Sequence, residues 1–151
     1  MKKLHLLPLL FLFALMSCKK EDKEAAPSIN EQIKGRWDVI RDILVYYDKD
    51  NREIYRKPYE IRMVFTFDGT AYREYMGRFS PYEGTYTLSS NNGKDYITLQ
   101  GLPNNPIEVK GFSETNMSWI IEHQDNIYRD PVTYQEKTAH HAVYILEFER
   151  R

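Results

Sequence analysis

Cys18 is the only cysteine of the chain, and it stands at a sharp boundary in the sequence. The apolar run Leu4–Met16 ends two residues before it, and the charged run Lys19–Glu24 follows it directly. One thiol cannot close an intramolecular disulfide, and no second thiol is present for a cysteine-rich metal site or a redox pair. Any chemistry at Cys18 therefore belongs to this thiol alone.

His123 and His140 are the next candidates for chemistry. Strand alternation puts both on inward-facing positions at one end of the predicted fold, where they would form a metal site or a pH-sensitive latch. Two histidines fall short of the three or four ligands that zinc usually takes, so a solvent-exposed pair is the alternative. Asp48–Asn51 lacks the glycine and the distal glutamate of a calcium loop. We predict no metal site and no cofactor.

Motifs of catalysis are missing from the sequence, which has neither a Gly-x-Ser-x-Gly elbow nor a His-Glu-x-x-His pair. Glu122 and Asp125 lie close enough in the sequence to act as an acid and a base, but carboxylates at strand ends are usually just solvated. We therefore predict that the protein is not an enzyme.

The overall composition is that of one globular domain. The 151 residues are 42% hydrophobic and 14% aromatic, which excludes a disordered chain. The 21 Lys and Arg nearly balance the 22 Asp and Glu, giving a formal net charge of -1. Without an excess of positive charge there is no basic field to attract a phosphate backbone, so we predict no nucleic-acid partner.

The amino-terminal segment has the layout of a secretory signal. Lys2 and Lys3 precede the apolar run, which is shorter than the about 20 residues needed to span a bilayer. Leu15–Cys18 resembles the lipobox of bacterial lipoproteins, in which the signal peptidase cuts before the cysteine and the thiol carries a diacylglycerol. The resemblance implies a signal peptide at 1–17 and lipidation at Cys18, which would make the lipid bilayer a partner. A plain signal peptide beside a free thiol is the alternative.

Residues 18–27 form a charged tether without apolar periodicity. Lys19–Glu24 resembles the lysine-then-acidic export signal of some Gram-negative lipoproteins. This resemblance implies the bacterial outer membrane, with the protein facing the cell surface or the periplasm. A solvated linker that only holds the domain away from the lipid is the alternative.

Residues 28–151 have the alternating apolar pattern of β-strands, rich in Val, Ile, Thr, Tyr and Phe. Ser28 or Asn30 would cap a short helical turn that ends at Gly35. We predict eight strands, Arg36–Tyr47, Glu60–Phe67, Thr70–Met76, Glu83–Ser89, Asp95–Gln100, Ile107–Phe112, Met117–His123 and Ala142–Glu149. Short strands at this spacing predict an antiparallel sandwich or barrel.

The lengths of the connections favour the barrel. Asp68-Gly69, Ser90–Lys94 and Ser113–Asn116 are tight turns, whereas Asp48–Tyr59 and Gln124–His141 are long. In an up-and-down order the tight turns gather at one end and the long connections at the other. We predict an all-β fold, an eight-stranded antiparallel up-and-down barrel with one closed and one open end, whose interior holds one small ligand or is filled by side chains.

Gly35-Arg36-Trp37 opens the first predicted strand and resembles the Gly-x-Trp signature of lipocalins and their calycin relatives. Together with the helical turn, the eight strands and the lipobox, it makes the chain resemble the small bacterial lipocalin-like lipoproteins. The chain departs from larger lipocalins in lacking paired cysteines and a clear Thr-Asp-Tyr segment. In this family the tryptophan lies at the closed end under a basic side chain of the last strand. Alternation puts Arg150 on the inward register, so it would cover Trp37 in a cation-π contact worth about 0.5–2 kcal/mol. A frayed terminal residue at Arg150 is the alternative.

Two hypotheses for function remain open. In the first, the barrel binds a small hydrophobic or amphipathic ligand, with Asp48–Tyr59 and Gln124–His141 as a lid. The predicted ligand-binding residues are Met63, Phe65, Phe67, Tyr86, Trp119, Ile121, His123 and Tyr144. In the second, the barrel is filled and its long loops contact a surface protein or glycan through tyrosines, which are favoured at interfaces. Those tyrosines are Tyr55, Tyr59, Tyr128 and Tyr134. An interior cavity open between the two long loops would favour the first hypothesis.

Overall fold

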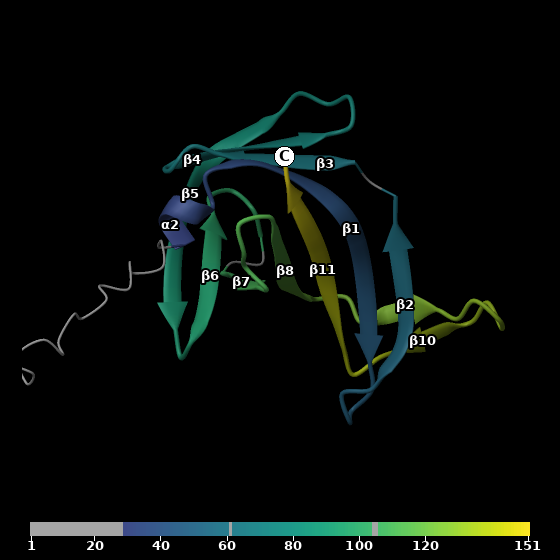
Figure 1. Ribbon diagram of the computed structural model, residues 1–151. Coiled ribbons are helices and arrows are strands. Elements are labelled where there is room, and N and C mark those ends of the chain that lie inside the picture. The colour runs from purple at the N-terminus through teal and green to yellow at the C-terminus, as the bar shows by residue number, and fades with distance from the viewer. Residues whose placement is uncertain (1–28, 61, 104–105) are drawn as a thin grey trace, which may run out of the picture.

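The computed structural model describes residues 29–60, 62–103 and 106–151 (Figure 1). The predicted signal peptide, the lipidation at Cys18 and the charged tether lie outside the described residues, as does Ser28. Among the described residues, no helix is both long and apolar enough to span a membrane.

Eight strands form a closed antiparallel barrel, which confirms the predicted fold. In barrel order they are β1 (Gly35–Tyr47), β3 (Met63–Phe67), β4 (Ala71–Met76), β5 (Tyr82–Asn91), β6 (Lys94–Leu99), β7 (Ile107–Lys110), β8 (Asn116–His123) and β11 (His141–Arg150). Each strand pairs with its neighbour in this order, and β11 pairs with β1 to close the wall. A short helix, α2 (Ile29–Gln32), precedes β1 and lies at one end of the barrel (Figure 1).

Local sequence explains the hairpins at the closed end. The Asp68 carboxylate accepts hydrogen bonds from the backbone N–H groups of Thr70 and Ala71, at 3.0 and 2.8 Å, which fixes the turn between β3 and β4. Asn92 and Gly93 both have positive φ, as the turn between β5 and β6 requires. These local signals set the strand register independently of the barrel core.

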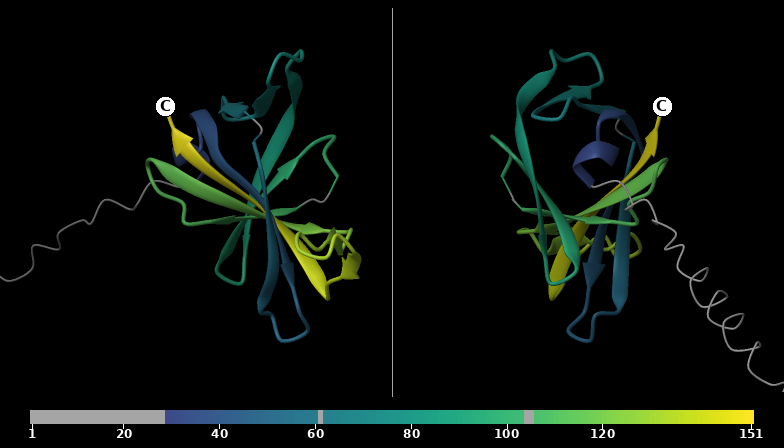
Figure 2. Two further views of the ribbon diagram at one scale, coloured as in Figure 1. Left: turned by 90° about the vertical axis from the view of Figure 1, so that its right-hand side faces the viewer. Right: turned by 60° about the vertical axis from the view of Figure 1, so that its left-hand side comes forward.

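The two long connections are not loops, which corrects the sequence-based prediction. Asp48–Tyr59 contains β2 (Glu53–Tyr59), and Gln124–His141 contains the hairpin of β9 (Ile127–Arg129) and β10 (Glu136–Thr138). The strand predicted to start at Glu60 begins at Met63. β2 pairs only with β1, so it is an edge strand that tolerates Pro58 and a largely exposed, charged sequence. The hairpin of β1 and β2 projects beyond the barrel (Figure 1 and Figure 2).

β1 changes partner along its length. Its first residues pair with β3, from Gly35 to Asp38, and its second half pairs with β2, starting at Asp42. The register with β11 is interrupted by a bulge between Val39 and Arg41. The extra residue of a bulge bends a strand and turns the following side chains to the other face. The strand therefore leaves β3 at the bulge and continues beside β2.

The closed end is sealed around Trp37. The indole Nε1 of this fully buried residue donates to the carbonyl of Ile33 at 2.7 Å. The guanidinium carbon of Arg150 lies 4.7 Å from the centre of the Trp37 ring, which is the contact that strand alternation predicts. The same guanidinium donates hydrogen bonds to the carbonyl of Gln32, the last residue of α2, and to that of Lys34, which follows the helix. Arg150 thus ties the last strand to the helix and the first strand.

The closed half of the barrel is filled with aromatic side chains. Phe67 packs edge-to-face on Tyr86, and Phe65 packs edge-to-face on Trp119, with ring centres 5.0 and 4.9 Å apart. Phe148 lies 4.6 Å from Trp119 between ring centres. All five side chains are buried. These five side chains form a packed aromatic floor, and any open space in the barrel lies between this floor and the open end.

Candidate functional site

A pocket of about 300 Å³ lies inside the barrel at its open end. Its walls come from β3, β4, β7, β8, β11 and the connection between β6 and β7. The lining residues are Met63, Phe65, Glu74, Met76, Leu102, Pro103, Ile107, Trp119, Ile121, His123, Tyr144 and Leu146. The pocket is therefore mostly apolar, with a few polar groups, as ligand sites usually are.

Most of the predicted ligand-binding residues line this pocket, and two lie below it. Met63, Phe65, Trp119, Ile121, His123 and Tyr144 are in its wall. Phe67 and Tyr86 are in the packed closed half, where neither contributes to the lining. Alternation along a strand identifies the inward face of a residue but not its depth along the barrel. The barrel is thus filled by side chains in its closed half and has a pocket in its open half. On the sequence alone, a filled interior and a ligand-holding interior were alternatives.

The two segments predicted as a lid do not line the pocket, which corrects that prediction. Instead, the strands they contain pack on each other through tyrosines. The Tyr55 ring lies 5.8 Å from Tyr46 and 5.0 Å from Tyr128 between ring centres. Tyr59 packs beside them, and its ring centre lies 6.0 Å from that of Tyr144. Of the four tyrosines predicted as contact residues, only Tyr134 is largely exposed, at 70%.

Glu74 is the one carboxylate in the pocket wall, and the sequence did not single it out. It is paired with Phe65 across β3 and β4, so its side chain points to the inner face. Burial raises the pKa of its carboxyl above the ordinary value. Its side chain has neither an ion pair nor a hydrogen bond with any of the residues described. Its neighbour Arg73 faces outward, where it pairs with Glu83 at 2.8 Å.

Asp42 is a second inward-facing carboxylate, more deeply buried than Glu74, on the inner face of β1 just beyond the bulge. Its side chain is 3% exposed, and within the described part of the chain neither oxygen has a hydrogen-bond donor in bonding geometry. Burial raises the pKa of this carboxyl, and the nearby Tyr144 hydroxyl partly opposes the change. Asp42 lines a second cavity, of about 390 Å³, together with Tyr59 and Arg62.

Tyr144 connects the two carboxylates. Its ring lines the pocket that contains Glu74, and it packs edge-on against Tyr59 beside Asp42. Burial raises the pKa of the Tyr144 hydroxyl, and the charges of Asp42 and Glu74 raise it further. Both carboxylates therefore act on a single hydroxyl, one from β1 and the other from β4.

The two predicted histidines are engaged with different partners. His123 lines the pocket, and its Nδ1 lies 2.8 Å from the carbonyl oxygen of Asp125. His140 is exposed, and its Nδ1 lies 3.4 Å from that of His141. Within residues 29–60, 62–103 and 106–151, no group of three or more His, Cys, Asp or Glu is placed to hold a metal ion.

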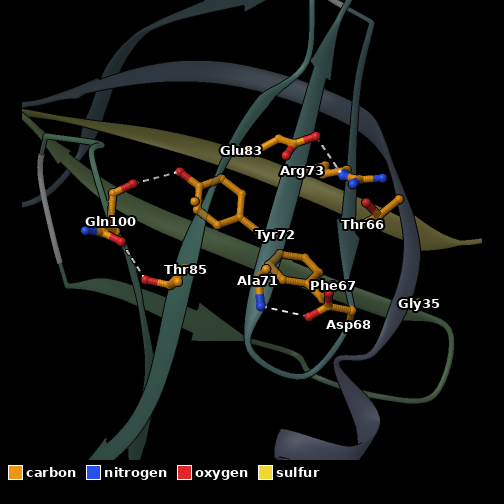
Figure 3. Close-up of a pocket in the computed structure, with 11 residues that line it drawn as sticks. Gly35, Thr66, Phe67, Asp68, Ala71, Tyr72, Arg73, Glu83, Thr85 and Gln100 are labelled. Carbon is orange, nitrogen blue, oxygen red and sulfur yellow. Dashed lines mark hydrogen bonds and ion pairs between the residues drawn. The ribbon is translucent and has the colours of Figure 1, made fainter.

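A larger hollow of about 640 Å³ lies along β3, β4 and β5 near the closed end, and the outward-facing Arg73 and Glu83 form part of its lining (Figure 3). Several of the polar groups that line it form hydrogen bonds with one another. Gln100 accepts a hydrogen bond from the Tyr72 hydroxyl on its backbone carbonyl, at 3.1 Å, and from Thr85 on its side chain, at 2.7 Å. Gly84 is required here, because a Cβ would lie 2.9 Å from the Tyr72 ring. These hydrogen bonds join the strands of the wall, which is a structural role. We therefore take the interior pocket, and not this hollow, as the candidate site.

Comparisons with known proteins do not indicate what this pocket binds. No protein-family model matches this chain, and no curated protein sequence matches it. A solved structure described as EF1p2_mFAP2b bound to DFHBI is similar to it, with a TM-score of 0.34 and 13% sequence identity. The match covers 82% of this chain and 99% of that chain. A likeness this distant carries no argument about function, which is therefore drawn from the pocket and its side chains.

Proposed function

We propose that the protein is a lipocalin-like, non-catalytic binding protein that takes a small hydrophobic or amphipathic ligand into the open end of its barrel. The observation that supports this proposal is the interior pocket of about 300 Å³ above a packed aromatic floor. Binding would be driven by burial of apolar ligand surface, worth about 25 cal/mol per Å². Because the wall is a closed sheet, little of that energy would be lost in ordering the site.

The size of the pocket restricts the ligand. Pockets for drug-sized ligands range from about 300 to 1,000 Å³, so this one is at the small end. Phe65 and Trp119 prevent a longer ligand from extending toward the closed end. A ligand with one aromatic ring or a short aliphatic chain fits these dimensions better than a long acyl chain.

Nuclear magnetic resonance titration with 2-phenylethanol, a small neutral ligand, tests this proposal. The indole N–H signal of Trp119, in the pocket wall, is expected to shift in a saturable way. The indole signal of Trp37, at the closed end, provides an internal control. Ile121→Phe places a larger side chain in the pocket, and we expect it to weaken binding at least about fivefold, since overlap with the ligand costs about 1 kcal/mol or more.

Ile120→Phe is the matched control, because Ile120 neighbours Ile121 on β8 but does not line the pocket. This variant is expected to bind 2-phenylethanol as the unmodified protein does. Equal shifts of both indole signals, or equal affinities of the two variants, would show that the ligand is not in the pocket.

The proposed location is the bacterial outer membrane, to which a lipid on Cys18 would anchor the barrel. The proposal is supported by the resemblance of Leu15–Cys18 to a lipobox and by the charged run after it. Protease treatment of intact cells distinguishes the two orientations, since only a barrel on the cell surface is accessible to the enzyme.

Cys18→Ala removes the thiol that would carry the lipid, so the protein is expected to move from the membrane fraction to the soluble fraction. Ser17→Ala is the control, because it keeps Cys18 and puts another small residue before the cut. Fractionation and immunoblotting measure the distribution. If the Cys18→Ala protein stays with the membrane, the anchor lies elsewhere in the chain.

A further inference from the structure

The inner face of the barrel toward its open end carries two carboxylates, Glu74 and Asp42, and neither forms an ion pair with a described residue. Glu74 is the only acidic residue among those that line the pocket, and neither lysine nor arginine is among them. Glu74 faces Phe65, Trp119 and Tyr144, which are aromatic. A carboxylate in such an apolar site costs free energy unless an opposite charge comes close to it.

Asp42, on a different strand, is a further inward-facing carboxylate that favours positive charge nearby. It is 97% buried, it forms no ion pair with a described residue, and the Tyr144 hydroxyl lies near both it and Glu74. The two arginines near its cavity do not neutralise it. Arg41 pairs with Glu147 on the outer face, at 3.1 Å, and Arg62 is exposed and forms no ion pair with a described residue. The sheet thus directs two carboxylates inward from different strands and no lysine or arginine into the pocket.

We infer that the ligand of this pocket is an organic cation, a protonated amine on one aromatic ring or a short apolar body. This inference rests on the proposed function, because it names the chemical class of ligand for the same pocket. The ammonium group binds the Glu74 carboxylate, and the apolar body lies on Trp119 and Ile121. Phe65, Trp119 and Tyr144 supply aromatic rings, to which cations are attracted, and Asp42 lies on the inner face opposite Leu146 of the pocket wall.

Three ligands with the same phenyl body and different head groups test the inference in the unmodified protein. They are 2-phenylethylamine, which is positive at neutral pH, 2-phenylethanol, which is neutral, and 3-phenylpropionate, which is negative. Affinity is measured from the Trp119 indole signal. A charged partner strengthens a buried hydrogen bond, so we expect the amine to bind roughly tenfold to a hundredfold more tightly than the alcohol. The carboxylate should bind more weakly than the alcohol.

Glu74→Gln keeps the shape of the side chain and removes its charge. We expect this variant to lose the preference for the amine and to keep its affinity for the alcohol. Glu122→Gln is the matched control, because Glu122 is an exposed residue of β8 whose loss changes the net charge equally. In that control the preference should remain, which separates a local charge effect from the overall charge of the protein.

Each other outcome counts against the inference. If the alcohol binds and the amine is not preferred, or if Glu74→Gln leaves the preference intact, the cation assignment is wrong and the binding function stands. The same conclusion follows if the carboxylate binds most tightly. If no ligand moves the Trp119 signal, the inference and the proposed function both fail.

Discussion

Replacement of Trp119 by alanine is expected to lower the free energy of unfolding by about 3–5 kcal/mol. Trp119 is 1% exposed and packs on Phe65 and Phe148, with ring centres 4.9 and 4.6 Å away. The strands around it are hydrogen-bonded into a closed barrel, so they cannot move inward to fill the space that the indole leaves. Urea denaturation measures the loss, and an unchanged slope would show that the unfolded state is the same.

Trp119→Phe is the matched control for this prediction. The indole Nε1 of Trp119 is buried without a hydrogen-bond partner in the described residues, so a phenyl ring removes an unpaired N–H while keeping much of the apolar contact. We expect a loss of about 1–2 kcal/mol, since a smaller cavity forms and the cost of burying the N–H disappears. Equal losses for alanine and phenylalanine would contradict the packing argument.

The Trp119→Ala protein also tests the limit on ligand size. Removing the indole extends the pocket toward Phe148, on which Trp119 packs, so we expect longer apolar ligands to bind that the unmodified protein excludes. This expectation connects stability to function, because the same side chain that fills the core also sets the depth of the pocket.

The barrel could be predicted from the sequence because its signals are local. Alternation of buried and exposed residues, as in Met63–Phe67, identifies both the strand and its inner face. Asp68-Gly69 and Asn92-Gly93 fix two of the hairpins without reference to distant residues. The resemblance at Gly35-Arg36-Trp37 implied a basic side chain over Trp37, and alternation on the last strand selected Arg150.

Features that depend on the neighbouring strands could not be predicted. β2 is exposed and charged because only one side of it is paired, so it lacks the apolar pattern of a barrel strand. β4 has apolar residues on both registers, so its sequence alone does not show that Glu74 faces inward. The depth of Phe67 and Tyr86 depends on the stagger of the strands, which the sequence does not reveal.

Asp42 was missed for a different physical reason, the bulge in β1. Before the bulge the inward residues of this strand have odd numbers, as Trp37 shows, and after it they have even numbers, as Leu44 and Tyr46 show. Uninterrupted alternation from Trp37 would have placed Asp42 on the outer face. One extra residue was enough to move a carboxylate into the interior.

Asp42→Leu is expected to raise the free energy of unfolding at pH 7.5 by about 1–3 kcal/mol, because burial of the carboxylate is unfavourable and the Tyr144 hydroxyl offsets only part of that cost. Leucine has nearly the same shape, and it would extend the apolar cluster that Leu44 and Tyr46 form on the same face. The loss of the interaction with the Tyr144 hydroxyl acts in the opposite direction and limits the gain. Asp42→Asn keeps a partner for that hydroxyl without the charge, so it should also be more stable than the unmodified protein at this pH.

The gain from Asp42→Leu should depend on pH in a defined direction. Burial raises the pKa of Asp42 in the folded protein above its ordinary value, so the folded state holds this proton more tightly than the unfolded state does. The destabilisation by Asp42 is then complete above the raised pKa, and it disappears as the pH falls through that pKa toward about 4. Urea denaturation of both proteins from pH 7.5 to pH 4 should therefore show their difference in stability shrinking on acidification. A leucine variant that is less stable at pH 7.5, or a difference that is constant with pH, would mean that the charge of Asp42 is compensated in the folded protein. If the gain is found, the barrel retains a carboxylate that lowers its own stability, which is the expected trade-off when a buried charge is kept for a ligand.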